Sequence, residues 1–178
     1  MNKINKVKTL IDYRLTSADI STHRMVKYES TRQAFAEMVK LEAFDAEDLF
    51  DRIHACFEET SNDRPYHDWY HTCCVVEGTI QGLRYHLKAD LGSLSETQQK
   101  EVNSTIVAAA FHDAGHTGVK EPDIVNVSRS IMIASHFLTN SGIHDASADS
   151  VTVDLPFVLE TLQSTQYPFK REPLNEYQ

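Results

Sequence analysis

Apolar residues recur at helical spacing along most of the chain. In one stretch they are three or four residues apart, which places them on one face of a helix that Asp45 can cap. The positions on that face are Leu49, Ile53, Cys56 and Phe57. An earlier and shorter stripe predicts another helix, capped by Ser30, with an apolar face made of Phe35, Met38 and Val39.

A further predicted helix leads toward residues that can carry chemistry. Ser95 and Gln98 have the spacing of a capping box, in which each side chain bonds the backbone of the other residue. The stretch that follows becomes increasingly apolar and ends in an alanine-rich run at Phe111. This helix would therefore present His112 and Asp113 at a buried end.

Two more helices are predicted in the second half of the chain. One is expected to start with Asp123 as its cap and to end just before Gly142. The other begins near Asp154 and ends before Tyr167, because a residue that precedes proline disfavours helical geometry. Residues 1–25 have weak periodicity and are expected to be loosely ordered. Strand-like alternation is scarce, so the sequence predicts an all-α fold in which residues 1–178 form a single helical domain.

Length and composition indicate the number of domains, the cellular compartment and the state of the cysteines. A chain of 178 residues fits one domain, and no apolar run approaches the roughly 18 residues of a membrane span. The basic start lacks the apolar core of a signal peptide, so the expected compartment is the cytoplasm. Cys56, Cys73 and Cys74 lack C-x-x-C spacing and are expected to be reduced thiols.

The net charge limits the partners. A formal charge of −9 argues against a surface for polymeric nucleic acid, since phosphate backbones require clustered positive charge. A small anionic substrate would instead need a local cation. A bound metal ion can supply that charge.

Four histidines form two pairs with a spacing of four residues, His67 with His71 and His112 with His116. On a helix this spacing places both imidazoles on one face, so each pair can point toward a common site. A single pair of this kind is common on helix surfaces. The second pair, however, follows the alanine-rich run, where an uncompensated His112 and Asp113 would cost a few kcal/mol of desolvation. A divalent metal ion is the simplest compensation.

Two segments resemble a known family. Pro65-Tyr66-His67-Asp68-Trp69-Tyr70-His71 resembles the Y-H-N-x-x-H segment of the 3′,5′-cyclic nucleotide phosphodiesterases, which belong to the HD superfamily of metal-dependent phosphohydrolases. The segment from Ala110 to Gly118 resembles their H-D-x-x-H-x-G segment, and the segment from Asp123 to Ser130 is weakly similar to the D-x-x-N-x-x-x-S stretch of small bacterial HD proteins. The fold that this resemblance implies is a bundle of α-helices.

The resemblance also implies roles for individual residues. Ligands to one or two divalent ions (Mn, Mg, Zn or Fe) would be His71, His112 and Asp113. Catalysis would involve His67 as proton donor and His116 beside the second metal or its water. Residues that orient the ligands would be Asn126, Ser130 and Asp68.

The chain departs from the family pattern at two places. The family has one more aspartate ligand on a helix that follows the stretch here formed by residues 162–169, and no aspartate follows that stretch. Asp145, Asp149 and Asp154 precede it. We therefore expect the domain to lack that helix and to hold a second ion poorly. Asp68 also stands where the phosphodiesterases have Asn.

The expected function is hydrolysis of a small nucleotide, a cyclic one among the candidates, by a metal-activated water with a histidine acid. Two alternatives remain open at the level of sequence. One is a di-iron oxygenase, because some HD-type proteins use the same ligands for O₂ chemistry. The other is a nucleotide-binding or interaction domain that is catalytically impaired by the lost aspartate.

Overall fold

The computed structural model describes residues 17–61, 66–87, 93–143 and 152–166, and these residues form helices and connecting turns without any strand. The helices are α2 (Ser17–Met38), α3 (Ala46–Thr60), α4 (Trp69–Leu87), α5 (Glu96–Phe111), α6 (Asp123–Ser141) and α7 (Leu155–Ser164). The prediction of an all-α fold is therefore confirmed for the described part of the chain. No described helix is both long enough and apolar enough to cross a membrane.

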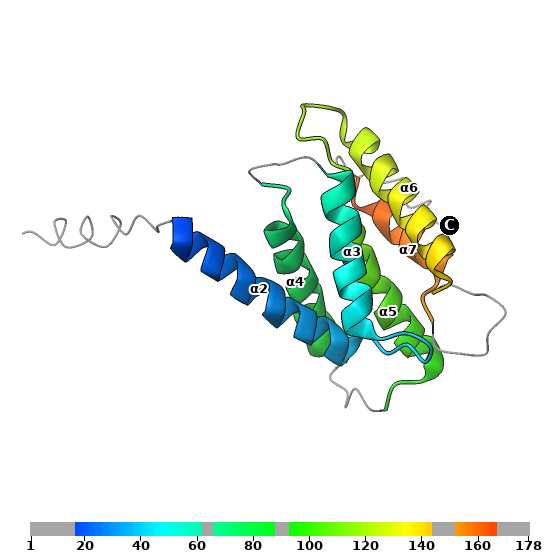
Figure 1. Ribbon diagram of the computed structural model, residues 1–178. Coiled ribbons are helices and arrows are strands. Elements are labelled where there is room, and N and C mark those ends of the chain that lie inside the picture. The colour runs from blue at the N-terminus through cyan, green and yellow to red at the C-terminus, as the bar shows by residue number, and fades with distance from the viewer. Residues whose placement is uncertain (1–16, 62–65, 88–92, 144–151, 167–178) are drawn as a thin grey trace, which may run out of the picture.

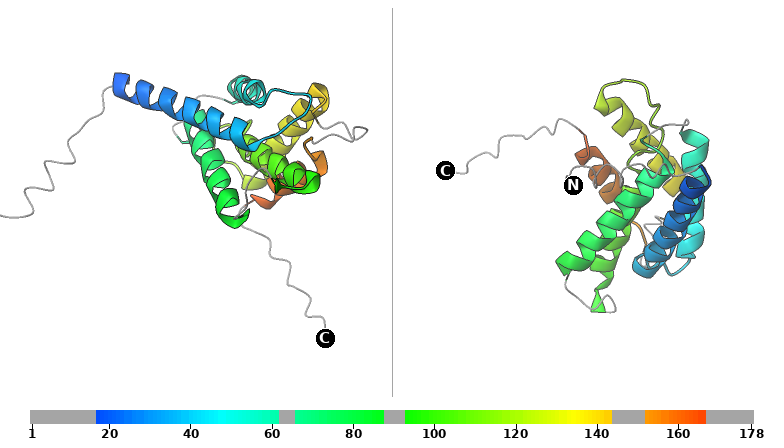
Figure 2. Two further views of the ribbon diagram at one scale, coloured as in Figure 1. Left: turned by 90° about the horizontal axis from the view of Figure 1, so that it is seen from below. Right: turned by 90° about the vertical axis from the view of Figure 1, so that its left-hand side faces the viewer.

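The helices pack side by side around one core. Helix α5 lies between α4 and α7, while α2 packs on the other side of α4 and α6 packs on α7. Helix α3 rests mainly on α2 (Figure 1; the packing is seen from two other sides in Figure 2). The largest fully buried side chains include Phe35, Phe50, Ile106, Phe111 and Leu138, which come from α2, α3, α5 and α6. Burial of such side chains is the main stabilising contribution to a bundle of this kind.

Most of the predicted helix ends are confirmed. The Asp45 carboxylate accepts a hydrogen bond from Asp48 N at the start of α3, and Ser95 and Gln98 form both bonds of the capping box at the start of α5. Gly142 ends α6 in the left-handed conformation at φ 69°. Asp154 caps α7.

Two predicted starts are wrong. Helix α2 begins at Ser17, so Ser30 lies inside it, and residues 17–25, which were expected to be loosely ordered, are helical. The described side chains from Asp19 to Val26 are exposed. This part of the helix therefore lacks the apolar stripe from which a helix can be predicted. Helix α6 is preceded by Pro122, and Asp123 is its first residue rather than its cap. An acidic residue in the first turn is favoured by the helix dipole instead.

The single tryptophan joins the core to the start of α4. Trp69 is the first residue of that helix and is only 8% exposed. Its indole stacks on the imidazole of His54 at 4.7 Å between ring centroids and contacts Phe50 and Phe57 at 5.4 and 5.3 Å. These rings attach the beginning of α4 firmly to α3.

Candidate metal centre

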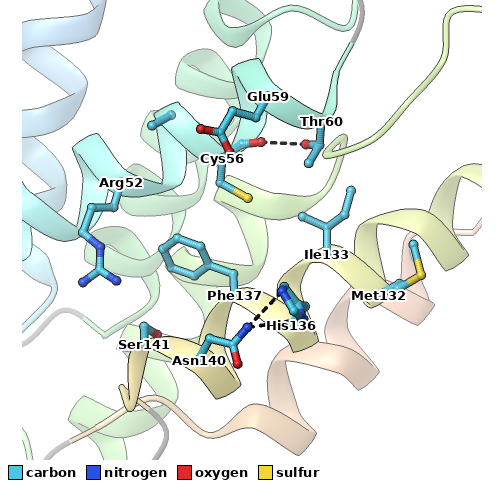
Figure 3. A pocket seen from close by; sticks show the side chains of 11 residues that line it. Arg52, Cys56, Glu59, Thr60, Met132, Ile133, His136, Phe137, Asn140 and Ser141 are labelled. Atoms are coloured by element: carbon cyan, nitrogen blue, oxygen red, sulfur yellow. Dashed lines mark hydrogen bonds between the residues drawn. The ribbon is translucent and has the colours of Figure 1, made fainter.

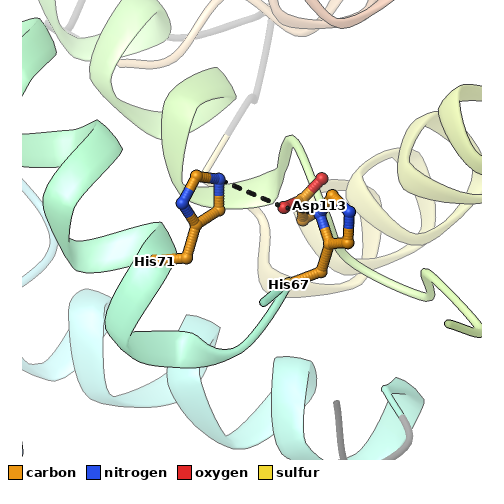
Figure 4. A group of neighbouring side chains, drawn as sticks. All are labelled: His67, His71 and Asp113. Carbon is orange, nitrogen blue, oxygen red and sulfur yellow. Dashed lines mark hydrogen bonds and ion pairs between the residues drawn. The ribbon is translucent and has the colours of Figure 1, made fainter. Parts of the chain in front are cut away.

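The residues of the two histidine motifs meet where α4 begins and α5 ends (Figure 4). His71 lies in the first turn of α4, and His67 lies in the bend that precedes this helix. Helix α5 ends at Phe111, and residues 112–115 form a turn. Neither histidine pair lies on one helix, so the helical-face geometry predicted from their spacing is wrong, although the side chains do converge.

Local hydrogen bonds explain why α4 begins after His67 and why α5 ends before His112. Asp68 Oδ1 accepts from the backbone N–H of His71, which makes Asp68 the cap of α4 and leaves His67 outside the helix. At the other motif, Ala114 N donates to Phe111 O at 3.0 Å, which closes a tighter turn than the α-helix. Gly115 follows at φ 74°, a conformation that ends a helix.

Three side-chain atoms form a compact triangle. His71 Nε2 lies 3.4 Å from His112 Nε2 and 3.5 Å from Asp113 Oδ2, and His112 Nε2 lies 3.2 Å from the same oxygen. Ligands about 2.1 Å from a tetrahedral ion are separated by about 3.4 Å. The triangle therefore has the dimensions of one face of a tetrahedral site, and its members are the three residues named as ligands from the sequence.

The far side of the His112 ring fixes which nitrogen can act as a ligand. His112 Nδ1 lies 2.8 Å from the carbonyl oxygen of Ala109, and a carbonyl can only accept, so the proton is assigned to Nδ1. In the neutral ring the lone pair is then on Nε2, the atom in the triangle. A backbone acceptor behind a ligating histidine is the usual way in which proteins fix the tautomer for metal binding.

His67 approaches the carboxylate from another direction. Its Nδ1 lies 2.7 Å from Asp113 Oδ2, and one atom each of His67, His71 and Asp113 fall within 4.8 Å of one another. Its ring stacks on His116 with centroids 3.9 Å apart and planes 15° apart. His116 Nδ1 accepts from the backbone N–H of Gly118. His67 thus contacts the proposed ligand set, whereas His116 lies one ring further out.

The protonation of the ligands suits a cation. Burial raises the pKa of Asp113, but hydrogen bonds and positive charge from His112 and His67 outweigh it and leave this pKa below its ordinary range. Burial lowers the pKa of His71. Burial also opposes protonation of His112, yet the Asp113 hydrogen bond leaves that pKa raised. The centre therefore offers an ionised carboxylate with a neutral His71, and a proton on His112 would have to leave before an ion could bind.

Two of the residues expected to orient the ligands, Ser130 and Asp68, act on the backbone that carries them. The hydroxyl of Ser130 is buried and lies 2.9 Å from His112 O and 3.0 Å from Ala114 O, so it holds the turn that carries Asp113. Asp68 caps the helix of His71 and also forms an ion pair with Arg24 at 2.7 Å. An asparagine could make the cap but not the ion pair. Asn126 accepts a hydrogen bond from Arg129 at 3.3 Å.

Sequence analysis missed two residues near the centre. Ser61 Oγ accepts from the backbone N–H of Gly115 at 3.2 Å and so joins the end of α3 to the turn. Tyr66 packs its ring on His71, 4.7 Å between centroids, and meets His67 edge-on at 5.0 Å. Tyr66 could have been found from the sequence because it directly precedes His67. Ser61 could not, because it lies 54 residues from Gly115 and no local pattern connects the two.

A second carboxylate ligand is not found among the described residues. The cluster around Asp113 is the only group of His, Cys, Asp or Glu side chains there with metal-ligand spacing. Asp154 caps α7, while Asp145, Asp149 and residues 167–178 lie outside the described residues. The described donors are therefore three imidazoles and one carboxylate.

An apolar groove of about 610 Å³ lies between α3 and α6, away from the histidine motifs (Figure 3). Its walls include Cys56 from α3 together with Ile133 and Phe137 from α6. None of the candidate ligands lines it. Its connection to the centre is indirect, because Ile133 also packs against Gly115.

Comparison with known proteins returned no matching family model, no similar curated protein and no similar solved structure.

Proposed function

We propose that this chain is a metal-dependent phosphohydrolase that acts on a small nucleotide, with 3′,5′-cyclic nucleotides among the candidate substrates. The observation that carries the proposal is the triangle formed by His71 Nε2, His112 Nε2 and Asp113 Oδ2, with edges of 3.2 to 3.5 Å. Two neutral imidazoles and one carboxylate are a donor set for Zn, Mn or Fe and leave coordination positions open for water and substrate.

A divalent ion held there would polarise a phosphoryl oxygen and acidify a water molecule, which is the chemistry that phosphate ester hydrolysis requires. The protein residues supply the rest. Asp113 and the two histidines would hold the ion, and the contacts of Ser130 and Ser61 with the turn keep Asp113 in place.

His67 is proposed as the proton donor to the leaving oxygen. Its Nδ1–H donates to Asp113 Oδ2, and this bond orients the ring and leaves Nε2 free to carry the transferred proton. The stacked ring of His116 restricts the tilt of His67. This arrangement supports a role for His67 in proton transfer, with His116 as a positioning residue.

The test is a metal and substrate panel. Chain freed of metal by chelation is supplied with Mn, Mg, Zn or Fe and incubated with cyclic and linear nucleotides, and phosphate ester cleavage is followed by chromatography. We expect cleavage with at least one redox-inert ion. No turnover with any metal would refute hydrolysis, and iron-dependent O₂ consumption instead would indicate oxygenase chemistry.

Variants assign the roles. Asp113→Ala is expected to lose both bound metal and turnover, because it removes the only carboxylate among the described donors. His67→Ala is expected to keep its metal and to lose about 10²–10⁴-fold in kcat. His136→Ala, an exposed histidine in α6, is the control and should change neither quantity. Full metal content and activity in both Asp113→Ala and His67→Ala would contradict the assignment.

A further inference from the structure

Beside the metal centre lies an aromatic side chain to which the proposed reaction assigns no role. Tyr66 is 65% exposed, although its ring is 4.7 Å from the ring of His71, with an angle of 35° between the planes. It also meets the ring of His67 edge-on, with the centroids 5.0 Å apart. The ring therefore contacts two residues of the centre and still presents most of its surface to solvent.

We infer that Tyr66 is a specificity-determining residue that stacks on the base of a nucleotide whose phosphate is held at the centre. The inference rests on the proposed function. A nucleoside phosphate bound at the triangle has its base one sugar away from the phosphorus, and the exposed ring adjoining His71 is within that reach. A flat aromatic face favours nucleotides over phosphate esters of similar charge that lack a base.

The arrangement of the neighbouring rings supports this role. His71 and His112 direct their Nε2 atoms into the triangle, and His67 directs Nδ1 to Asp113. Each of these three imidazoles thus directs one nitrogen into the centre. Tyr66 contacts the centre through its ring, at His67 and His71. What it offers a substrate is its exposed ring face.

The test compares two ligands that differ only in the base, adenosine 5′-monophosphate and ribose 5-phosphate. Their dissociation constants are measured by equilibrium dialysis on the full chain loaded with Zn²⁺. We expect the nucleotide to bind about 5- to 150-fold more tightly, the range that a stacked base contributes. Tyr66→Ala should weaken nucleotide binding to about the level of ribose 5-phosphate. Its affinity for ribose 5-phosphate and for Zn²⁺ should remain within about twofold of the original.

Matched variants exclude other roles for Tyr66. Tyr66→Phe retains the ring and should retain the preference, and so should Tyr85→Ala, which removes a tyrosine on α4 that is 81% exposed. Equal binding of both ligands by the unsubstituted chain would overturn the inference. Loss of the preference in Tyr66→Phe would overturn it too, as would loss of Zn²⁺ affinity in Tyr66→Ala, which would indicate that the ring only shields the ligands.

These measurements do not depend on turnover. A chain that binds adenosine 5′-monophosphate preferentially through Tyr66 but cleaves no nucleotide would refute the proposed hydrolysis and keep the inference. A chain that cleaves nucleotides and shows no base preference would support the proposed hydrolysis and refute the inference about Tyr66.

Discussion

At the scale of single residues, Gly115 links the metal centre to the rest of the bundle. It adopts φ 74°, and its backbone N–H donates to Ser61. A Cβ atom at this position would lie 2.5 Å from Cδ1 of Ile133, which is closer than van der Waals contact allows. Glycine is therefore favoured here by the backbone conformation, and an added Cβ would also crowd α6, where it would lie 3.3 Å from Cβ of Arg129.

Gly142 provides a matched comparison for a prediction about Gly115. It has φ 69°, but nothing lies within 4 Å of the Cβ that an alanine would add. Gly142→Ala should cost about 1 kcal/mol of unfolding free energy through backbone strain alone. Gly115→Ala should cost about 1–3 kcal/mol more, because of the clash with Ile133. Urea denaturation of the two variants measures the difference.

The double variant Gly115→Ala/Ile133→Val checks the cause of this difference. It removes Cδ1 of Ile133 and should recover part of the lost stability relative to Ile133→Val alone. Equal costs for Gly115→Ala and Gly142→Ala would show that the close approach does not limit the turn.

The sequence predicted the chemistry of the centre better than its geometry. His71, His112 and Asp113 were named as ligands because two segments resemble a known family, and the structure places these candidate ligand atoms together. The geometry predicted from four-residue spacing on a helix was wrong for both pairs. Helix ends depend on a cap and a tight turn, here at Asp68 and Gly115, and these bonds cannot be read from spacing.

At the scale of secondary-structure elements, a partly buried polar cluster attaches α2 to α4. The carboxylate of Glu77 forms an ion pair with Lys27. Its Oε1 also accepts hydrogen bonds from Ser30 at 2.8 Å and Thr31 at 2.7 Å. Burial raises the pKa of Glu77, but these hydrogen bonds and the charge of Lys27 outweigh it, and the pKa is lowered. Ionised Glu77 thus stabilises the packing of the two helices.

This cluster gives a prediction with a defined dependence on pH. Because the pKa of Glu77 is lower in the folded chain than its ordinary 4.5, its contribution is present above that ordinary value and lost as the pH falls through the folded value. Glu77→Gln keeps a hydrogen-bond acceptor but removes the charge. We expect it to lower the unfolding free energy by about 1 kcal/mol at pH 7. The difference from the original chain should disappear below the folded pKa.

A second ion pair between the same helices serves as the control. Glu37 pairs with Arg84 at 2.8 Å, but the two side chains are 53% and 42% exposed. Solvent screens such a pair, so Glu37→Gln should have little effect at any pH. An equal loss of stability in both variants, measured by denaturant titration between pH 3 and 7, would contradict the role given to the Glu77 cluster.

The elements themselves were predictable where a cap and an apolar stripe coincide. Helices α3, α5 and α7 have both, and their starts at Asp45, Ser95 and Asp154 were identified from sequence. The first half of α2 was missed because its described residues face solvent on all sides. Helical hydrogen bonding leaves no pattern in the sequence when no face is buried.

At the scale of the whole molecule, binding of an ion at the centre should stabilise the complete fold. The candidate ligands come from the start of α4 and the turn after α5, so the intact cluster requires both helices in place. A ligand at 100 times its Kd adds about 2.7 kcal/mol to the unfolding free energy of a protein that binds it only when folded. For a chain of this length that corresponds to a rise in Tm of about 5–10 °C.

Calorimetry with and without Zn²⁺ measures this rise. Asp113→Asn keeps the size of the side chain and removes its charge, so it should show little or no rise. An equal rise in Asp113→Asn and in the original chain would place the ion elsewhere on the molecule.

The helical class and the single bundle followed from periodicity and length, because these properties are distributed over the whole chain. The packing order of the helices could not be predicted from periodicity or length. Which helix lies next to which depends on contacts such as that of Asn103 with the backbone of Lys40, 63 residues away, and no local pattern records them.

The position of Trp69 has a practical consequence for optical experiments. It is the only indole of the chain, and it lies at the first residue of α4, two positions from both His67 and His71. Intrinsic fluorescence excited at the red edge of protein absorption therefore comes from Trp69 alone. Its emission reports on the start of α4, beside the candidate metal centre, without any attached dye.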